Sequence, residues 1–304
     1  MKQTMVSRVM AYLAHRRALG FKLLIEGRLL LNFGRFADRC RHRGPLSLHI
    51  ALRWSTLPQS SDRLYQARRL EVIRTFAKHL ALVEPRTVVP PRHLLGPAHR
   101  RAEPYIYSEL QIRQLMSRAI RLSGTIRPHT LQTLIGLLAC AGLRISEALK
   151  LKLTDVDLDT GVLTIRESKY QKTRFVPLDR SVITHLSAYS RRRQKLFPLA
   201  EFFFVSQQGA GLPAAAARRA FSQLRKGLPS ARRAPRFHDL RHTFTCRVLV
   251  RWQRSARGAA YRVPILSRYL GHAHVTDTYW YLTSLPELMT EAAKRFEQFR
   301  DEDH

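Results

Sequence analysis

Apolar residues recur at helical spacing between Val9 and about Val83, and basic residues occupy many of the positions between them. The clearest run consists of Leu70, Ile73, Phe76, Ala77 and Leu80. Residues three and four apart share one face of a helix, so this spacing predicts amphipathic helices that bury one side. The pattern therefore predicts a small helical domain with basic flanks over residues 1–85.

A proline-rich segment without a hydrophobic period follows this helical region. Proline fixes the backbone and removes an amide donor, so repeated prolines favour an extended connection over a helix. The segment predicts a linker over residues 86–104 and, after it, a second domain over residues 105–304.

The second domain combines helical patterns with one short strand-like stretch. Residues 128–142 are apolar on almost every side, which is typical of a helix in the middle of a domain, and Gly142 is expected to end it. Two strand-like runs, residues 162–166 and 174–177, flank a polar turn that carries lysine. Helical patterns continue to a predicted C-terminal helix over residues 284–300. The expected fold is mainly α with a small antiparallel β-sheet.

The charge of the chain points to a polyanionic partner. Lysine and arginine number 53 against 22 acidic residues in a chain of 304, which gives a formal net charge of +31 and a pI of about 11.4. Solubility needs a net charge of only about 2 to 8 for a small domain. The excess therefore predicts binding to nucleic acid.

Other function classes are disfavoured by features that the sequence lacks. Cys40, Cys140 and Cys246 lie far apart without a CxxC pair, so neither a disulfide framework nor a zinc knuckle is expected. No apolar run reaches the roughly 18 residues of a membrane helix, and the N-terminus has no run typical of a signal peptide. The sequence predicts a reducing, cytoplasmic location and no membrane partner.

A group of carboxylates in TDVDLDTG imitates a calcium-binding loop. The group consists of Asp155, Asp157 and Asp159, but Gly161 falls one position late and Arg166 stands where the loop needs a closing glutamate. We expect a polar turn here that leads into the first strand, and no bound metal.

Several cationic side chains stand in positions where they could bind a phosphate. Arg144 directly follows the end of the buried helix, where a fork-shaped guanidinium could be held rigidly. Lys169 lies on the polar turn between the two strands. His238 and Arg241 are three residues apart and share one helical face, whereas His242, one position further, is the less expected partner. Each of these residues alone is also compatible with a structural role.

The stretch GHAHVTDTYWYL, residues 271–282, has three interpretations: a buried aromatic helix, a metal site on His272 and His274, or a tyrosine presented for chemistry. The metal site lacks a third ligand nearby. Residues two apart on a helix point about 200° away from each other. Only one of Tyr279 and Tyr281 can therefore face a given site.

One protein family carries these residue types in the same order. AGLR with Arg144, the hairpin lysine Lys169, HDLR, LSRYLGH and a tyrosine nine residues after its histidine resemble the tyrosine recombinases, the phage-integrase family of site-specific DNA strand-exchange enzymes. The likeness spans most of residues 105–290. The N-terminal helical region is similar to the family's core-binding domain, which implies a two-domain clamp around DNA. HVTDTYWYL and EPYIYSEL are similar to recombinases carried by bacterial transposons and encoded several in a row.

The resemblance implies which residues bind the reacting phosphate. Arg144, Arg241 and His272 would contact its non-bridging oxygens, where negative charge builds up in the transition state. Glu147 would buttress Arg144 without reacting itself.

The resemblance also implies the nucleophile. The nine-residue spacing from His272 selects Tyr281, whereas Tyr279 and Trp280 would pack the helix in place. His238 would help to take the proton of the phenol, whose ordinary pKa is about 10 against about 6.5 for imidazole.

Lys169 resembles the mobile lysine that protonates the leaving 5′ oxygen. The glycines that commonly flank this lysine in the family are Ser168 and Tyr170 here. Lys172 is the alternative acid.

The function implied is cleavage and rejoining of DNA strands at specific sites through a 3′-phosphotyrosyl intermediate, in the integration or transposition of a mobile element. Such an intermediate stores the energy of the phosphodiester bond, so no metal or other cofactor is implied. The alternatives are a catalytically idle DNA-binding subunit and a nicking and closing enzyme similar to type IB topoisomerases. The implied partners are double-stranded DNA and further copies of the chain in a tetramer, or sibling recombinases, at the bacterial nucleoid.

The C-terminal segment is expected to contact protein and not DNA, because residues 283–304 carry more acidic than basic side chains. Ser284 and Glu287 fit a capping box at the start of a helix. The apolar residues of this helix form one stripe: Leu285, Leu288, Met289, Ala292, Phe296 and Phe299. By resemblance the stripe docks on a neighbouring protomer; packing on its own domain is the open alternative.

Overall fold

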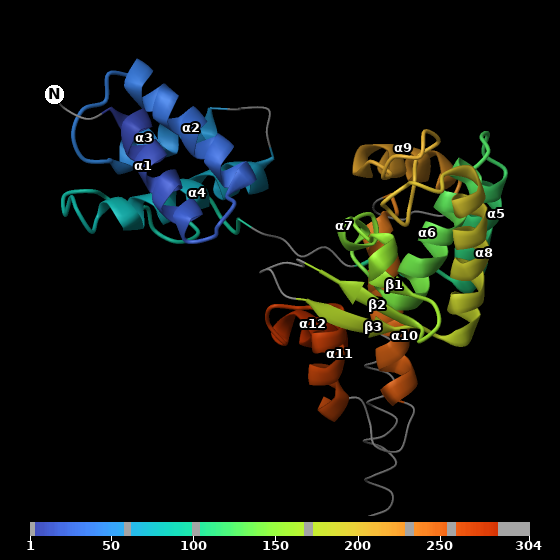
Figure 1. Cartoon of the computed structure of the whole chain (residues 1–304). Helices are drawn as coiled ribbons and strands as arrows, with labels where there is room; N and C mark the ends of the chain where they lie inside the picture. Colours follow the sequence, from blue (N-terminus) through green and yellow to red (C-terminus); the bar gives the residue numbers. More distant parts are fainter. Residues whose placement is uncertain are drawn as a thin grey trace, which may run out of the picture. The chain divides into compact units, whose positions relative to one another are not determined.

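The computed structural model separates into two compact units, Met1–Ala102 and Glu103–His304 (Figure 1). Each unit has a hydrophobic core of its own. The residues that the structure describes are 4–57, 62–98, 104–166, 173–228, 234–253 and 260–284.

The first unit is helical. Its described helices are α1 (Met5–Ala18), α2 (Leu24–Arg39), α3 (Leu48–Thr56) and α4 (Arg63–Leu80). The side chains of Thr4, Ser47 and Asp62 cap α1, α3 and α4 by accepting hydrogen bonds from first-turn amides. The apolar run on α4 is buried from Leu70 to Leu80, as its helical spacing predicts.

One basic residue of α4 departs from the expected exposed flank. Arg69 is buried, with its guanidinium carbon 3.7 Å from the centre of the Trp54 ring. Its Nη2 donates to the carbonyl of Trp54 at 2.7 Å. A flat guanidinium stacks well on an aromatic face, so this arginine fills part of the core.

The start of the proline-rich segment belongs to the first unit. The amide of Val88 donates to the carbonyl of Leu46 at 2.8 Å, and Nε of Arg74 donates to the carbonyl of Pro90 at 2.9 Å. These bonds hold part of the segment expected as a linker, residues 86–104, against the first helical unit.

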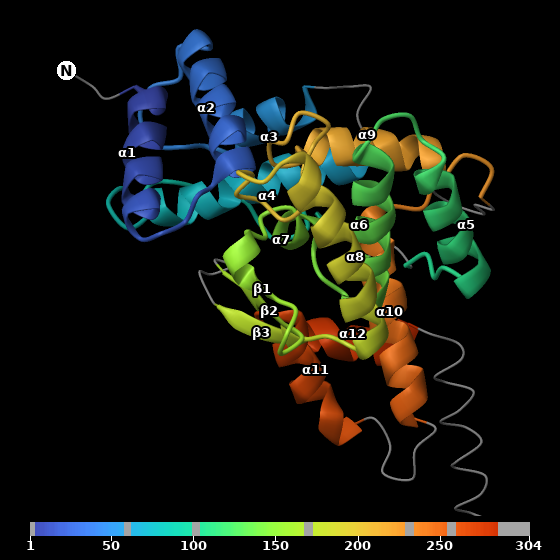
Figure 2. The same cartoon turned by 45° about the vertical axis from the view of Figure 1, so that its right-hand side comes forward.

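The second unit is built around one central helix. Its described helices are α5 (Glu109–Ile120), α6 (Arg127–Ala141), α7 (Ile145–Ala148), α8 (Arg180–Leu196), α9 (Ala214–Leu224), α10 (Phe237–Gln253), α11 (Val263–Leu270) and α12 (Thr276–Ser284). Helix α6 packs against α5, α8 and α10, and Figure 2 shows it among them. It is buried on most sides, as its apolar sequence predicts.

The end of α6 requires a glycine. Gly142 has a φ of 61°, in the left-handed region, and a Cβ atom there would lie 2.4 Å from Cδ1 of Phe244. The chain turns sharply at this residue and reaches Arg144 two positions later.

A three-stranded antiparallel sheet, in the order β1-β2-β3, completes the second unit. Its strands are β1 (Val156–Asp157), β2 (Val162–Ile165) and β3 (Arg174–Pro177). In the register, Leu163 lies opposite Val176. The predicted fold class, mainly α with a small antiparallel sheet, is confirmed. Within the described residues, no helix is long and apolar enough to cross a membrane.

The segment expected as a polar turn contains β1, which at two residues is too short to show an alternating pattern. The carboxylate of Asp157 accepts hydrogen bonds from the amides of Asp159 and Thr160 at 3.0 and 2.9 Å. Asp155 accepts from Nε of Arg166 at 2.6 Å. These carboxylates therefore stabilise the turn before β2.

Candidate catalytic site

Arg144 lies between α6 and α7, and two contacts fix its guanidinium. Nη1 donates to Oε1 of Glu147 at 2.7 Å, and Nη2 donates to the carbonyl of Gly271 at 3.1 Å. The side chain keeps 23% of its surface exposed. Arg144 is thus held through both terminal nitrogens while part of its side chain stays exposed.

Glu147, on α7, is the buried acid of the site. It accepts from the side chain and the backbone amide of Arg144, and from both terminal nitrogens of Arg174 at 3.1 and 2.8 Å. Burial alone would raise the pKa of Glu147, but hydrogen bonds and charge from Arg174 and Arg144 outweigh it and lower the pKa to about 2. Its contacts are those of a buttress for Arg144.

Arg174, the first residue of β3, is a site residue that sequence reasoning missed. Besides its two bonds to Glu147, its Nε donates to the carbonyl of Tyr269 at 2.8 Å. The one signal in the sequence is alternation: in RFVP the arginine shares a strand face with Val176, which is fully buried. A charged residue on the buried face of a strand must find a partner, and here it finds Glu147.

Arg241, on α10, is almost completely buried, with 1% of its surface exposed. Its Nη1 donates to the carbonyl of Gly142 and its Nη2 to that of Leu270, both at 2.8 Å. Burial and the charge of Arg144 lower the pKa of Arg241, but a guanidinium stays protonated at neutral pH. Arg241 therefore joins the ends of α6 and α11.

Three guanidinium groups thus gather where two helices end. Arg241 contacts both ends, Arg144 contacts Gly271, and Arg174 contacts Tyr269. Carbonyl groups at the end of a helix carry partial negative charge, which favours cations there. With Glu147 as the carboxylate among them, the cluster offers fixed positive charge that suits a phosphodiester.

His238 and His272 are the two imidazoles predicted for the site. Partial burial, then the charges of Arg241 and Arg236, lower the pKa of His238 to about 4. Burial, then Arg241 and Arg144, lower that of His272 to about 3. Both rings are neutral at pH 7. The Nδ1 atom of His272 lies 2.7 Å from Oγ1 of Thr278, which is fully buried and orients the ring.

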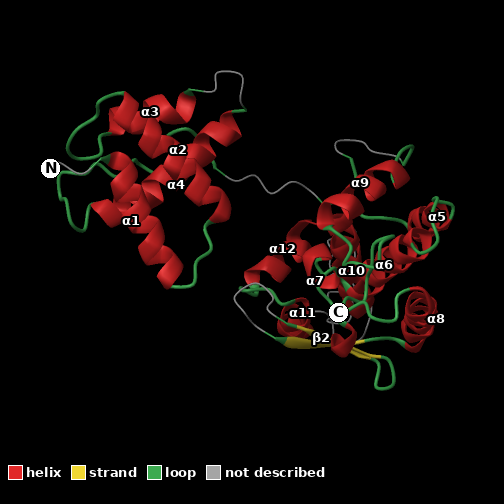
Figure 3. Cartoon of the chain, turned by 45° about the horizontal axis from the view of Figure 1, so that its top comes forward, coloured by secondary structure: helices red, strands yellow, loops and turns green. Residues whose placement is uncertain are grey.

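The aromatic stretch forms α12, which packs on α10 and α11; Figure 3 shows α11 next to the sheet. Tyr281 is buried, with 3% of its surface exposed, and its hydroxyl lies 2.6 Å from Nδ1 of His242. The prediction that Tyr279 packs the helix in place is wrong, because it is 42% exposed. Residues two apart point nearly opposite ways, so burying Tyr281 turns Tyr279 outward. Trp280 packs against the core, as predicted.

The metal interpretation of His272 and His274 finds no support in the geometry. His274 is exposed. Across the described ranges, no group of three or more histidine, cysteine, aspartate or glutamate side chains is placed to hold a metal ion.

Some predicted features lie outside the described residues. Lys169 and the alternative acid Lys172 fall between residues 166 and 173, and the predicted C-terminal helix begins at the last described residue, Ser284. The general acid and the C-terminal stripe therefore stay predictions.

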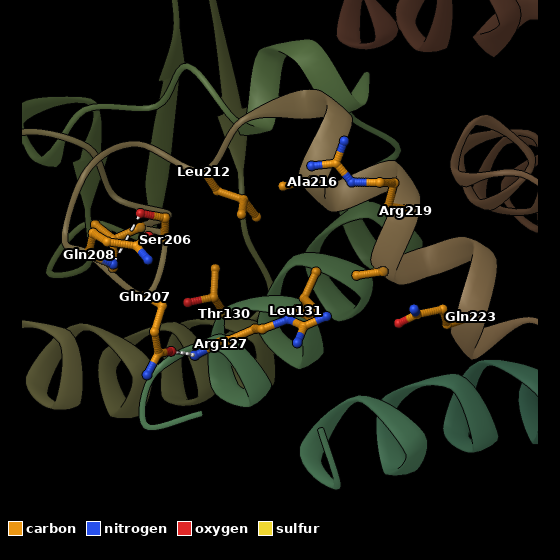
Figure 4. Close-up of a pocket in the computed structure, with 12 residues that line it drawn as sticks. Arg127, Thr130, Leu131, Ser206, Gln207, Gln208, Leu212, Ala216, Arg219 and Gln223 are labelled. Carbon is orange, nitrogen blue, oxygen red and sulfur yellow. Dashed lines mark hydrogen bonds between the residues drawn. The ribbon is translucent and has the colours of Figure 1, made fainter. Parts of the chain in front are cut away.

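A separate cavity of about 300 Å³ lies between α6, α9 and residues 205–212 (Figure 4). Its polar lining includes Arg127, Gln207 and Arg219. None of the residues predicted for catalysis lines it, so the candidate site is the arginine cluster.

Comparison with known proteins agrees with the fold. The model of the Phage integrase family matches residues 107–287. This match covers more than half of the chain, which therefore belongs to the phage integrase family, the tyrosine recombinases. The chain is accordingly an enzyme of site-specific DNA recombination.

Individual relatives support the same assignment. The chain is 40% identical over 302 residues to the protein y4rB of Sinorhizobium fredii, described as an integrase/recombinase, covering 95% of this chain and 96% of that one. It is 26% identical over 234 residues to the tyrosine recombinase XerC of Leptospira interrogans, covering 77% and 72%. Among solved structures, the Tn1549 transposon integrase bound to transposon right end DNA has a TM-score of 0.73 at 17% identity, covering 97% and 99%. That last likeness shows the fold.

Proposed function

We propose that the chain cleaves and rejoins duplex DNA through a 3′-phosphotyrosyl intermediate on Tyr281. The observation that carries this proposal is the placement of the Tyr281 hydroxyl against α10, the helix that also holds Arg241 in the arginine cluster. Attack by the phenol oxygen on phosphorus forms the tyrosyl bond and breaks the bond to the 5′ oxygen. Reversal of these two steps joins the strand to a new partner.

The proposed roles follow from the charges and contacts around Tyr281. Arg144, Arg241 and His272 bind the non-bridging oxygens of the phosphate, with fixed donors that need no rearrangement as charge develops. His238 lies on α10 with Arg241, and its ring packs edge to face on that of His242. Lys169 protonates the leaving 5′ oxygen. Two basic units on one chain suit a clamp around the duplex.

A covalent-complex assay tests this proposal. The protein is incubated with a pool of labelled nicked duplexes with a randomised central sequence, and the trapped species are resolved on a denaturing gel. We expect an adduct whose DNA, when sequenced, gives the recognition site, and whose peptide carries DNA on Tyr281. The adduct should form equally in EDTA and in magnesium, because the proposed cations belong to the protein. A chain that binds but never forms an adduct would be the idle subunit.

Exchange between two duplexes distinguishes a recombinase from a nicking and closing enzyme. With the selected site on two duplexes of different length, we expect hybrid products. Relaxation of supercoiled plasmid without hybrids would instead indicate the topoisomerase-like activity.

DNA binding should depend steeply on salt, because each phosphate neutralised by the protein releases counterions. A clamp of two basic units should contact roughly 8 or more phosphates. Each contact contributes about −0.9 to the slope of log K against log salt concentration, so we expect a slope of about −7. Filter binding over a salt series measures this slope. A slope expected for one or two contacts would contradict the clamp.

We further propose that the chain acts in an assembly, a tetramer or a complex with sibling recombinases, in the integration or transposition of a mobile element at the nucleoid. The resemblance to transposon-borne recombinases and the acidic C-terminal segment support this proposal. Deletion of residues 285–304 is expected to abolish assembly of two duplexes while leaving binding to a single site intact. Unchanged assembly and cleavage, measured by native gels and the adduct assay, would rule out docking between protomers.

Replacement of Arg174 by alanine should slow adduct formation more than it weakens DNA binding. Without Arg174, Glu147 loses two of its hydrogen bonds and can no longer hold Arg144 in one geometry. Small displacements of binding groups can cost about 100-fold in rate, so we expect a loss of about 10- to 100-fold at saturating DNA. Arg174→Lys should recover part of the rate, since it restores the charge and one bond.

The matched control for Arg174 is Phe175→Ala on the exposed face of the same strand, where the side chain is 69% exposed. A rate close to wild type is expected for the control. If both variants lost the same activity, the effect would belong to the hairpin as a whole.

A further inference from the structure

His242 follows the HDLR stretch directly and contacts the proposed nucleophile. Its Nδ1 atom lies 2.6 Å from the hydroxyl oxygen of Tyr281, within the range of a strong hydrogen bond. The two rings have their centres 5.5 Å apart. Because Tyr281 is only 3% exposed, bulk water has little access to the phenol in this arrangement. A protein group is therefore in place to receive the phenol proton.

The ring of His242 is also held in position by its neighbours. His238, one turn earlier on α10, lies edge to face with it at 4.5 Å between ring centres, and Trp280 on α12 lies at 6.3 Å. Packing between rings restricts the orientation of the imidazole, which keeps Nδ1 directed at Tyr281.

His238 is less suited to receive this proton. Its pKa of about 4 makes it a weak base at neutral pH, because burial and then the charges of Arg241 and Arg236 disfavour the protonated ring. A phenol with an ordinary pKa of about 10 transfers its proton poorly to so weak a base. A neutral His238 is better suited to donate a hydrogen bond to a phosphate oxygen.

We propose that His242 is the general base of strand cleavage and accepts the proton of Tyr281 on Nδ1. The inference rests on the proposed function, in which Tyr281 is the nucleophile. As the phenol O–H bond breaks, the Nδ1–H bond forms, and the freed oxygen electron pair bonds to phosphorus while the bond from phosphorus to the 5′ oxygen breaks. The departing oxygen takes its proton from the general acid, for which Lys169 is proposed.

The same proton returns when the strand is joined. The incoming 5′ hydroxyl bonds to phosphorus, the tyrosyl bond breaks, and protonated His242 gives its proton back to the phenolate. The general acid is reprotonated by the 5′ hydroxyl, so one cycle consumes no proton overall. His242 is therefore neutral while Tyr281 is free, and protonated while Tyr281 is bonded to DNA.

A chemical test separates the base from the acid. His242→Asn keeps a polar group near the position of Nδ1 but cannot take the proton, so its rate constant for adduct formation should fall about 100- to 10,000-fold, the usual contribution of a general base. The selected site is used in two forms, with an ordinary phosphate and with sulfur at the 5′ bridging position. A thiolate, with an ordinary pKa of about 8.5, leaves without an acid.

We expect the defect of His242→Asn to persist on the sulfur substrate, whereas Lys169→Ala should be slow on the ordinary substrate and fast on the sulfur one. Added imidazole should partly restore His242→Ala. The matched control is His274→Asn, which replaces an exposed histidine of the neighbouring loop and should react like wild type.

Three outcomes decide the matter. A wild-type adduct on Tyr281 with a normal rate for His242→Asn would overturn the inference and leave the proposed function standing. So would a defect in His242→Asn that the sulfur substrate removes, since His242 would then act on the leaving group. Absence of any wild-type adduct, or an adduct on another residue, would overturn the proposed function itself. Thermal unfolding and DNA affinity of each variant, with imidazole recovery of His242→Ala, separate lost chemistry from lost structure.

Discussion

Replacement of Tyr281 by phenylalanine is expected to abolish covalent adduct formation completely, because phenylalanine has no oxygen that can bond to phosphorus. DNA affinity should stay close to wild type, since Tyr281 is buried and the basic surface is unchanged. The lost contact with His242 should lower the free energy of unfolding by only about 0.5–1.5 kcal/mol, the usual net value of one hydrogen bond. Denaturing gels measure the adduct, and filter binding measures the affinity.

Tyr279→Phe is the matched control for this variant. It makes the same chemical change two residues away, on a side chain that is 42% exposed, and it should still form the adduct. Peptide mapping of the wild-type adduct adds an independent check. DNA attached to Tyr279 or to a serine would show that the buried tyrosine is not the nucleophile.

Sequence patterns predict the parts of this fold that depend on local spacing. The apolar run on α4 and the all-round apolar sequence of α6 give helices in the expected places. The strands β2 and β3 also lie where alternation predicts them, but β1 has too few residues for a pattern. Periodicity therefore predicts the long helices and the four-residue strands, whereas the two-residue strand β1 depends on its pairing with β2.

The candidate site depends on contacts between residues far apart in the chain. Arg174 bonds to Glu147 across 27 positions, and Tyr281 to His242 across 39. The order of the motifs predicts that Tyr281 matters, but its partner depends on how α12 packs on α10. Helical spacing places His238 on one face with Arg241 and so favoured His238 as the histidine of the site. The packing instead places His242 against the phenol of Tyr281. Such pairings follow from tertiary structure and have no signature in a single sequence.

Replacement of Glu147 by glutamine is expected to destabilise the second unit by roughly 3 kcal/mol at pH 7. The carboxyl has a pKa of about 2 in the folded protein against an ordinary value of 4.5, and each pH unit of difference corresponds to about 1.4 kcal/mol. Glutamine keeps the shape but not the charge. Arg144, Arg174 and Arg241 would then crowd together without the carboxylate that offsets their repulsion.

The pH dependence of this effect has a definite sign. Folding lowers the pKa of the Glu147 carboxyl, so its charged form stabilises the folded protein. This contribution is fully present above the pKa of the unfolded state, 4.5, and is lost as the pH falls towards the folded pKa of about 2. The gap in stability between wild type and Glu147→Gln should therefore be constant from pH 7 to about pH 5 and should shrink below that. A surface carboxylate would show a much smaller gap at every pH.

Urea unfolding of the full chain at several pH values measures this gap. The chain has three tryptophans, and a Trp54→Phe background leaves Trp252 and Trp280 as fluorescence reporters, both in the second unit. The control is Glu109→Gln, whose side chain is 73% exposed and 3.7 Å from Arg113; it should cost no more than about 1 kcal/mol, as exposed ion pairs do. Equal unfolding free energies for wild type and Glu147→Gln at pH 7 would show that the carboxylate does not hold the arginine cluster together, and the buttressing of Arg144 would have to be abandoned with it.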